Sequence, residues 1–207
     1  MKTIKTFLTA ILLATTTAAS AQFVNSDVDN YSLLTASAGM MSSNFTNGAE
    51  GKNAFGGSIG YLWGFNVTGH KLPLFVEVGP EVNYYTSSNE ELILGKTTAH
   101  NLSVTTPVNL VYKLRVSDKV SIAPFVGLSS RWNAMAKISA DGKSYDSVSD
   151  GNASRFQLGL NTGVGVYFDN FYLGYRYNHD LTSFQKATDK LPGISFDYHS
   201  ISLGFKF

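Results

Sequence analysis

The stretch LFVEVGPEVNYYT, residues 74–86, decides the fold class, because its side chains alternate between two kinds over the whole length. Val76 and Val78 fall on one face of an extended chain, and Glu77 and Glu81 fall on the other. A period of two predicts a β-strand. Strands of soluble proteins usually have about 5–6 residues, whereas a tilted strand that crosses a membrane needs about 9–11. The length of the alternation therefore favours a membrane-spanning strand.

Similar alternation recurs along the chain and predicts about eight strands of roughly 10–13 residues each. They cover residues 31–42, 54–65, 74–86, 101–113, 120–134, 155–168, 171–181 and 197–207. Their connections differ in length. The turns at 115–119 and 169–170 are short, the turn at 66–73 is of moderate length, and the polar segments 43–52, 87–97, 135–153 and 182–196 are longer. Short turns at one end and long loops at the other are typical of an antiparallel, up-and-down outer-membrane barrel.

The face opposite the apolar one consists mostly of Gly, Ala, Ser and Asn. Glycines such as Gly60 and Gly159 weaken a solvated strand, but in a narrow barrel they make room for large side chains that cross the lumen. The first and last strands must pair, because lipid does not tolerate an open sheet edge. A soluble β-barrel shares the period of two and stays as the alternative.

Aromatic side chains of the apolar face gather near strand ends, as in the girdles that lie at the headgroup level of a membrane. At the end with the short turns they are Trp63, Phe65, Tyr112, Phe168, Phe171, Phe205 and Phe207. We expect outer-membrane lipid to surround this face.

The N-terminus has the three parts of an export signal. Lys2 and Lys5 precede an apolar stretch at 7–14, and Ala19-Ser20-Ala21 provides small residues before Gln22. The apolar stretch is shorter than the roughly 20 residues of a membrane-spanning helix. We predict a cleaved signal peptide at residues 1–21 and a single β-barrel domain at residues 22–207.

Charge and cysteine content exclude several classes of protein. Cleavage would remove two of the 16 basic residues and none of the 15 acidic ones, which leaves a formal charge of about −1 (14 − 15). No basic field is present to attract nucleic acid. The chain has no cysteine, so it has neither disulfides, nor a lipid anchor on cysteine, nor a thiolate metal site.

Several segments resemble small outer-membrane β-barrel families of the OmpX and PorT-like kind. They are LSVTTPVNLVYKL at 102–114, IAPFVG at 122–127, residues 159–168, LGYRYN at 173–178 and SLGFKF at 202–207. The resemblance covers the whole mature chain and implies a barrel in the bacterial outer membrane, with both termini periplasmic and the long loops extracellular. The last segment, with Phe205 and Phe207, resembles the signal that the barrel assembly machinery recognises. Members of such families differ widely in role, so the resemblance implies no specific function.

Charged residues on the polar face predict a network inside the barrel. An eight-stranded barrel is filled by side chains rather than open as a channel. Our hypothesis is that Glu77 and Glu81 meet Arg176 and Arg155 in a lumenal network of ion pairs and hydrogen bonds. We favour a packed polar core, because an unpaired lumenal charge is very costly. A gate, a proton relay or a narrow channel is the alternative, and bilayer conductance distinguishes it.

A lipid hydrolase at the outer rim would need a histidine base between a serine and a carboxylate. His179, Asp180 and Ser183 are close in sequence, but alternation puts His179 on the lipid face and Asp180 in the lumen. We therefore expect no enzyme. The histidines lie in separate segments without metal-ligand spacing, and no nucleotide-binding motif occurs, so no metal site and no cofactor is predicted.

The outer loops are the better candidates for function, since polar loops on a rigid scaffold commonly carry binding. Asp141-Gly142 predicts a tight hairpin in the third long loop. On its two arms Lys137, Ile138, Lys143 and Tyr145 form a candidate site for an extracellular protein or surface ligand, bound by strand addition. A solvated extension without a partner is the alternative. The sequence thus predicts a structural or surface-binding barrel.

Overall fold

The computed structural model of the protein describes residues 28–47, 51, 53–91, 95–140, 143–151, 153–185 and 192–207. The predicted signal peptide lies outside these residues. Every regular element in the described ranges is a β-strand, so no helix there is long and apolar enough to cross a membrane. The all-β prediction is confirmed.

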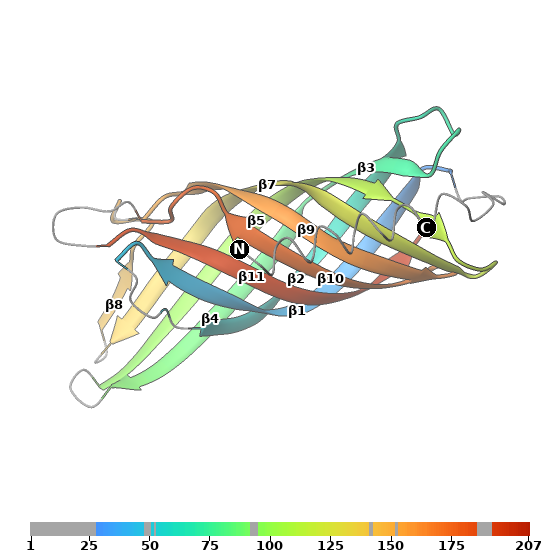
Figure 1. Ribbon diagram of the computed structural model, residues 1–207. Helices are drawn as coiled ribbons and strands as arrows, with labels where there is room; N and C mark the ends of the chain where they lie inside the picture. Colours follow the sequence, from blue (N-terminus) through green and yellow to red (C-terminus); the bar gives the residue numbers. More distant parts are fainter. Residues whose placement is uncertain are drawn as a thin grey trace.

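The strands form one closed, antiparallel barrel (Figure 1). They are β1 (Tyr31–Phe45), β2 (Asn53–Asn66), β3 (Leu74–Val78), β4 (Glu81–Glu91), β5 (Gly95–Tyr112), β6 (Leu114–Arg115), β7 (Val120–Ala140), β8 (Lys143–Asp146), β9 (Phe156–Phe168), β10 (Phe171–Asp180) and β11 (Ile194–Lys206). Sequential neighbours pair around the ring, and β11 returns to pair with β1 from Lys206 opposite Leu33 to Ile194 opposite Phe45. No edge is left in the wall.

β3 and β4 together occupy one strand position in the barrel wall, as the alternation in residues 74–86 predicts. The register against β2 is the same on both sides of the break, with Val78 opposite Trp63 and Glu81 opposite Gly60. Pro80 interrupts the ladder because it has no backbone N–H. Its carbonyl still accepts a hydrogen bond from the Tyr61 amide at 3.0 Å. Counted this way, and with β6 and β8 as additions to β5 and β7, the barrel has the eight strands expected.

The strands run further at the long-loop end than the sequence indicates. Residues 87–97 were expected to form a loop, but β4 continues to Glu91 and β5 begins at Gly95. Ser87 pairs with Ala99 and Asn89 with Thr97. Backbone hydrogen bonds hold these polar residues in the sheet, and pairing of this kind leaves no signal in side-chain hydropathy.

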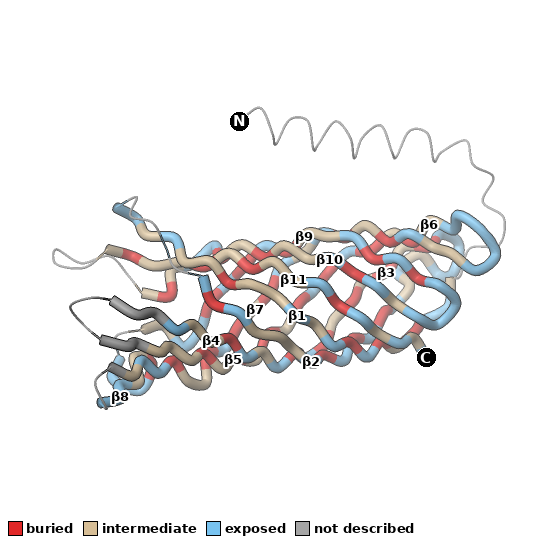
Figure 2. Tube along the Cα trace, turned by 90° about the horizontal axis from the view of Figure 1, so that it is seen from below, coloured by how far each residue is buried: buried red, intermediate tan, exposed pale blue. Residues whose placement is uncertain are grey.

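Side-chain exposure confirms which face points outward. Ile59 and Leu203 are 67% and 65% exposed on the outer surface, whereas Glu81 and Asn109 are 2% and 1% exposed. Buried and exposed residues alternate along the strands (Figure 2). The outer surface is thus apolar and the polar face lines the lumen, the reverse of a soluble barrel.

The lumen is filled in layers. Near the short turns lies an apolar cluster of Tyr31, Leu33, Leu62, Phe75, Val111, Ala123, Phe125 and Tyr167. Toward the long loops lies a second one of Met41, Ala54, Tyr85, Ala136, Val148, Phe184, Phe196 and Tyr198. Polar residues separate the two: along β7, Phe125 of the first cluster is followed by buried Ser129, Arg131 and Asn133 and then by Ala136 of the second.

A pair of introduced cysteines tests the closing seam. Ala38 and Ile201 are direct partners across β1 and β11 and both face outward, so their Cα atoms lie about 5.5 Å apart, a separation that a disulfide can span. We expect Ala38→Cys with Ile201→Cys to form an intramolecular disulfide in the folded protein, detected by gel mobility and mass spectrometry.

The matched control is Ala38→Cys with Phe205→Cys. Phe205 lies opposite Leu34, four residues along β1, which corresponds to about 13 Å. Equal cross-linking of the two cysteine pairs would show that the seam has another register.

Candidate functional site: lumenal network and outer hairpin

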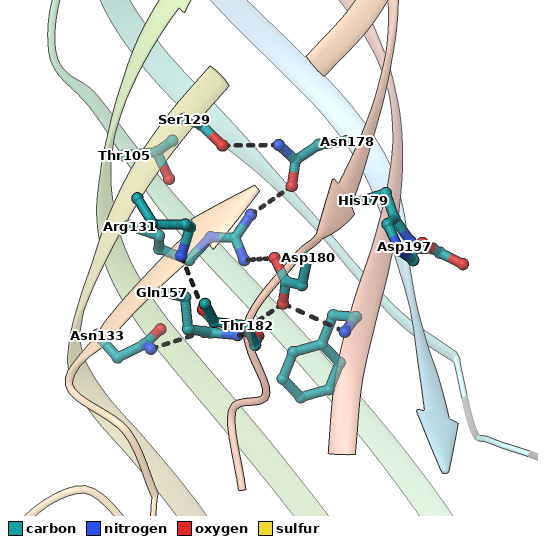
Figure 3. A network of polar contacts seen from close by, with 12 residues as sticks. Thr105, Ser129, Arg131, Asn133, Gln157, Asn178, His179, Asp180, Thr182 and Asp197 are labelled. Carbon is teal, nitrogen blue, oxygen red and sulfur yellow. Dashed lines mark hydrogen bonds and ion pairs between the residues drawn. The ribbon is translucent and has the colours of Figure 1, made fainter. Parts of the chain in front are cut away.

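The centre of the lumen is held by an ion pair between Arg131 of β7 and Asp180 of β10 (Figure 3). Arg131 Nη1 lies 2.6 Å from Asp180 Oδ1, and both side chains are at most 5% exposed. The other terminal nitrogen donates to Asn178 Oδ1 at 2.9 Å. The guanidinium carbon lies 3.9 Å from the ring centroid of Tyr198. The guanidinium therefore exchanges water for a carboxylate, an amide and an aromatic ring.

The second oxygen of Asp180 is satisfied as well. It accepts hydrogen bonds from Gln157 Nε2 at 2.6 Å and from the Phe196 amide at 3.2 Å. Gln157 Oε1 in turn accepts from Asn133 Nδ2 at 2.8 Å. Such additional bonds are what make a buried ion pair tolerable, because the attraction of the two charges alone hardly offsets their desolvation.

A short turn brings these groups to one depth. Asp169 adopts a left-handed φ of 51° in the turn Asp169-Asn170, which joins Phe168 directly to its partner Phe171. The register that follows places Asp180 opposite Gly159. A Cβ at Gly159 would lie 2.9 Å from Asn178 Nδ2, so the glycine is what lets the amide cross the lumen.

A second ion pair joins Arg176 to Glu81 nearer the short turns. Arg176 Nη1 lies 2.5 Å from Glu81 Oε2, and the glutamate side chain is 2% exposed. A Cβ at Gly60 would lie 2.6 Å from Glu81 Cγ, so this glycine provides the space for Glu81. The network hypothesis placed these two charges together, and the geometry shows them in contact.

The other two residues of the hypothesis lie elsewhere. Glu77 accepts hydrogen bonds from the Tyr31 hydroxyl and, at 3.3 Å, from the Tyr167 hydroxyl. Lys113 Nζ stands 3.2 Å from the centroid of the Tyr31 ring. Arg155 precedes Phe156, the first residue of β9, and its side chain is exposed rather than inside the lumen. The expected contact of Arg155 with the glutamates is therefore a wrong prediction.

The sequence contained a signal for the missed pair. Arg131 and Asp180 both lie on the polar face, and the turn at Asp169-Asn170 sets Asp180 one level from Gln157, the direct partner of Arg131. The lengths of the strands and of the short turn therefore predict that Arg131 and Asp180 lie at similar depth in the lumen and can form an ion pair. The phenol groups that hold Glu77 gave no such signal, since tyrosines also occur on the outer face.

A separate polar cluster lies on the outer surface. His179 Nδ1 is 2.6 Å from Asp197 Oδ1, and Asp197 also accepts from Asn44 at 2.8 Å and Tyr177 at 3.0 Å. Asp180 is on the other side of the wall, as alternation predicts (Figure 3). The carboxylate is thus surrounded by an imidazole, an amide and a phenol rather than by a serine nucleophile. No group of three or more metal-ligating side chains occurs among the described residues.

The predicted hairpin is present above the barrel. β8 pairs with the end of β7, with Lys143 opposite Ala140 and Tyr145 opposite Ile138. The four candidate side chains, Lys137, Ile138, Lys143 and Tyr145, are all exposed. The Asp141-Gly142 turn itself lies outside the described residues.

Asp146 fastens the base of this hairpin. Its carboxylate accepts from the amides of Ala136 at 3.2 Å and Val148 at 3.1 Å, and from the Ser149 hydroxyl at 3.1 Å. Burial opposes ionisation, but these hydrogen bonds outweigh it and hold the pKa of Asp146 below its ordinary value. The stabilisation is therefore present above the ordinary pKa of about 3.9 and is lost as the pH falls through the lowered value.

Amide exchange tests this clamp. The Ser149 amide also donates to Asp146 Oδ1, at 3.5 Å, beside the Val148 amide. We expect Asp146→Ala to reduce the protection of both amides at neutral pH, since their acceptor is gone. Acidification of the unmodified protein through the lowered pKa should have the same effect. Asp150→Ala, an exposed position in the same turn, is the control, and unchanged protection in Asp146→Ala would contradict the clamp.

Removal of Asp180 tests the central ion pair. Asp180→Ala leaves Arg131 buried without a countercharge, so we expect the free energy of unfolding to fall by about 3–5 kcal/mol. Urea unfolding in lipid vesicles, followed by tryptophan fluorescence, measures it. The double variant Arg131→Met with Asp180→Leu should recover most of the loss.

Asp118→Ala is the matched control, because Asp118 pairs with Arg115 at 3.4 Å but is fully exposed in a turn. No measurable change is expected there. If Asp180→Ala were as stable as Asp118→Ala, the ion pair would not hold the lumen.

Comparison with known proteins agrees with this architecture. The family model described as "Outer membrane protein beta-barrel domain" matches residues 7–207. No curated protein matches the sequence. Among solved structures, the outer membrane enzyme PagL has a TM-score of 0.53 at 12% identity over 84% of this chain and 98% of its own. Neisserial surface protein A has a TM-score of 0.50 at 18% identity over 85% and 97%. Ail of Yersinia pestis has a TM-score of 0.45 at 18% identity over 86% and 99%.

At these identities PagL and Neisserial surface protein A show a common fold and nothing more. The family match spans nearly the whole chain and confirms the resemblance found in the sequence. The chain therefore belongs to the outer membrane protein beta-barrel domain family and is an integral β-barrel protein of the bacterial outer membrane.

Proposed function

We propose that this barrel is a non-conducting, non-enzymatic surface-binding protein that presents the β7–β8 hairpin to an extracellular partner. The observation that carries the proposal is an exposed strand edge standing above a lumen filled with paired charges. β8 pairs with β7 and with no other strand in the described part of the chain.

The free edge of β8 suits an extended segment of another protein. An edge strand presents unpaired N–H and C=O groups, and a partner strand adds to them by backbone hydrogen bonds. Tyr145 is 57% exposed and Ile138 43%, so neighbouring side chains offer apolar contacts. Lys137 and Lys143 are exposed beside them and favour a partner segment with acidic residues.

The proposal includes an orientation in the membrane. We assign the long-loop end, with the hairpin, to the extracellular side, and both termini to the periplasm. The aromatic C-terminal strand supports this assignment: the rings of Phe205 and Phe207 are 5.1 Å apart, and Phe207 is 67% exposed. We infer that this strand binds the barrel assembly machinery during insertion and that residues 1–21 are removed on export.

The other two candidate functions have weaker support. A narrow channel needs a hydrated path through the lumen. Two ion pairs, Arg131 with Asp180 and Arg176 with Glu81, fill that space instead. A hydrolase needs a serine positioned by the histidine. The His179–Asp197 pair is instead held by Asn44 and Tyr177.

A backbone change at Ser144 tests strand addition most sharply. The Ser147 amide donates to Ala136 on β7, so by the alternation of an antiparallel ladder the Ser144 N–H points to the free edge. Ser144→Pro removes this edge donor and leaves the backbone ladder to β7 intact; the hydrogen bond from Ser139 Oγ to Ser144 Oγ, at 3.3 Å, is lost in Ser144→Pro and Ser144→Ala alike. Cells that display the protein are assayed for adhesion to immobilised extracellular proteins and to other cells.

We expect Ser144→Pro to weaken adhesion at least about tenfold, and Ser144→Ala, which keeps the N–H, to bind as the unmodified protein does. Heat-modifiable gel mobility confirms that both variants are folded. Full adhesion by Ser144→Pro, or no adhesion gained on display of the unmodified protein, would refute the proposal.

A further inference from the structure

A polar cluster interrupts the apolar outer wall of the barrel where β10, β11 and β1 approach the long loops. This wall cluster consists of Asn44, Tyr175, Tyr177, His179, Asp197 and His199. On the outward face of β11 it follows Leu203 and Ile201, which are 65% and 59% exposed and apolar.

The wall cluster lies at the level of lipid headgroups. Asp197 precedes Phe207, in the aromatic girdle at the short turns, by ten residues. At about 3.3 Å per residue and a tilt of about 40°, this is about 25 Å along the membrane normal. The apolar band of an outer-membrane barrel has the same height, about 25 Å. The polar groups therefore begin where the hydrocarbon ends.

Three rings form a platform on this part of the wall. Tyr177 and His199 are direct partners across β10 and β11, and their ring centroids are 4.9 Å apart. The Tyr175 hydroxyl lies 2.7 Å from His199 Nδ1, and Tyr175 is 44% exposed. The face of an aromatic ring carries partial negative charge. The C–H groups of a sugar ring are weakly positive, so a sugar packs well on such a platform.

Polar atoms beside the platform remain open to a ligand. The side chains of His179 and Asp197 are 44% and 22% exposed, and both lie on the outer side of the wall, away from the lumenal network (Figure 3). Asp197 Oδ2 accepts one hydrogen bond, from Asn44, and a carboxylate oxygen can accept a second. His179 binds Asp197 through Nδ1, which leaves Nε2 for another molecule.

The charge of the wall cluster disfavours a phosphate. When His179 is protonated, its pair with Asp197 has no net charge, and when it is neutral the pair is negative. The direct neighbours on β1 and β9 supply no cation: they are Met40, Ser42, Leu160, Thr162 and Val164. A phosphate would thus meet a carboxylate without a compensating lysine or arginine from these strands. Sugar hydroxyls bond to a carboxylate and an imidazole without bringing a charge.

We propose that the wall cluster binds the sugar headgroup of a membrane glycolipid. The sugar ring packs on Tyr175, Tyr177 and His199, and its hydroxyls bond to Asp197 Oδ2 and His179 Nε2. The acyl chains lie along the apolar wall toward Ile201. This site goes beyond the proposed function and shares no residue with the β7–β8 hairpin, so loss of lipid binding and loss of adhesion are separate results.

Three lipids with identical acyl chains test the site: monogalactosyldiacylglycerol, phosphatidylglycerol and diacylglycerol. Each is added at the same mole fraction to phosphatidylcholine nanodiscs that contain the full barrel. Native mass spectrometry counts the lipid molecules that the released protein retains. We expect the galactolipid to be retained at least about fivefold more than either of the others, since one or two hydrogen bonds distinguish it.

Two variants remove the two halves of the site. Asp197→Ala removes the acceptor and the partner of His179, and Tyr175→Leu removes a ring but keeps the wall apolar. Both should lower the preference for the galactolipid to about that for diacylglycerol. Heat-modifiable gel mobility confirms that each variant is folded.

Tyr84→Leu is the matched control. The Tyr84 hydroxyl lies 2.7 Å from His100 Nδ1 on β4 and β5, as Tyr175 does from His199. The other hydrogen bond of His100 is with Thr86 rather than with a carboxylate. Tyr84→Leu should therefore retain the galactolipid as the unmodified protein does.

Equal retention of the three lipids by the unmodified protein would overturn the proposal. Preferred retention of phosphatidylglycerol would assign the wall cluster to phosphate headgroups instead. An equal loss in Tyr84→Leu and Tyr175→Leu would show a general aromatic girdle without a site. Displacement of the galactolipid by millimolar methyl galactoside in solution would show a site for free sugar, and would overturn the assignment to a membrane lipid.

Discussion

Pairing of β11 with β1 closes the ring, and lipid makes this closure obligatory because it offers no hydrogen bonds to a sheet edge. A ring of eight strands encloses a lumen that side chains can fill. The charged residues that point inward then have no bulk water to hydrate them. They must pair with one another, and the width set by closure brings Arg131 within 2.6 Å of Asp180.

Pairing inside the lumen determines where function resides. The two ion pairs occupy the middle of the barrel. Glu77 is held within the apolar cluster near the short turns, and the second apolar cluster lies toward the long loops. A wall so braced is a rigid support for whatever stands on it. The free edge of the hairpin lies above this support, at the end with the long loops, where contact with other molecules requires no opening of the lumen.

Much of this architecture was predictable because membrane and lumen impose opposite requirements on alternate residues. The alternation in residues 74–86 gave the correct strand across Gly79-Pro80, and the Asp141-Gly142 signal gave the β7–β8 hairpin. Predictions failed where backbone pairing between strands, rather than side-chain hydropathy, determines where a strand ends. Arg155 lies on the same side of the alternation as the lumenal residues but precedes the first residue of β9, and the polar residues 87–91 and 95–97 extend their strands through backbone pairing. The shift of register between Leu102 and Ser103, which leaves Ala134 without a direct partner on β5, has no counterpart in the alternation. That shift lets Asn133 and Ala136, three residues apart on β7, both face inward.

The central claim is that paired charges and packed rings close the lumen. Single-channel recording of the purified protein in planar bilayers tests it most directly, with insertion verified by protease protection of the barrel. The account predicts no unitary conductance above that of the protein-free membrane. A steady, reproducible conductance step from the inserted, unmodified barrel would contradict it.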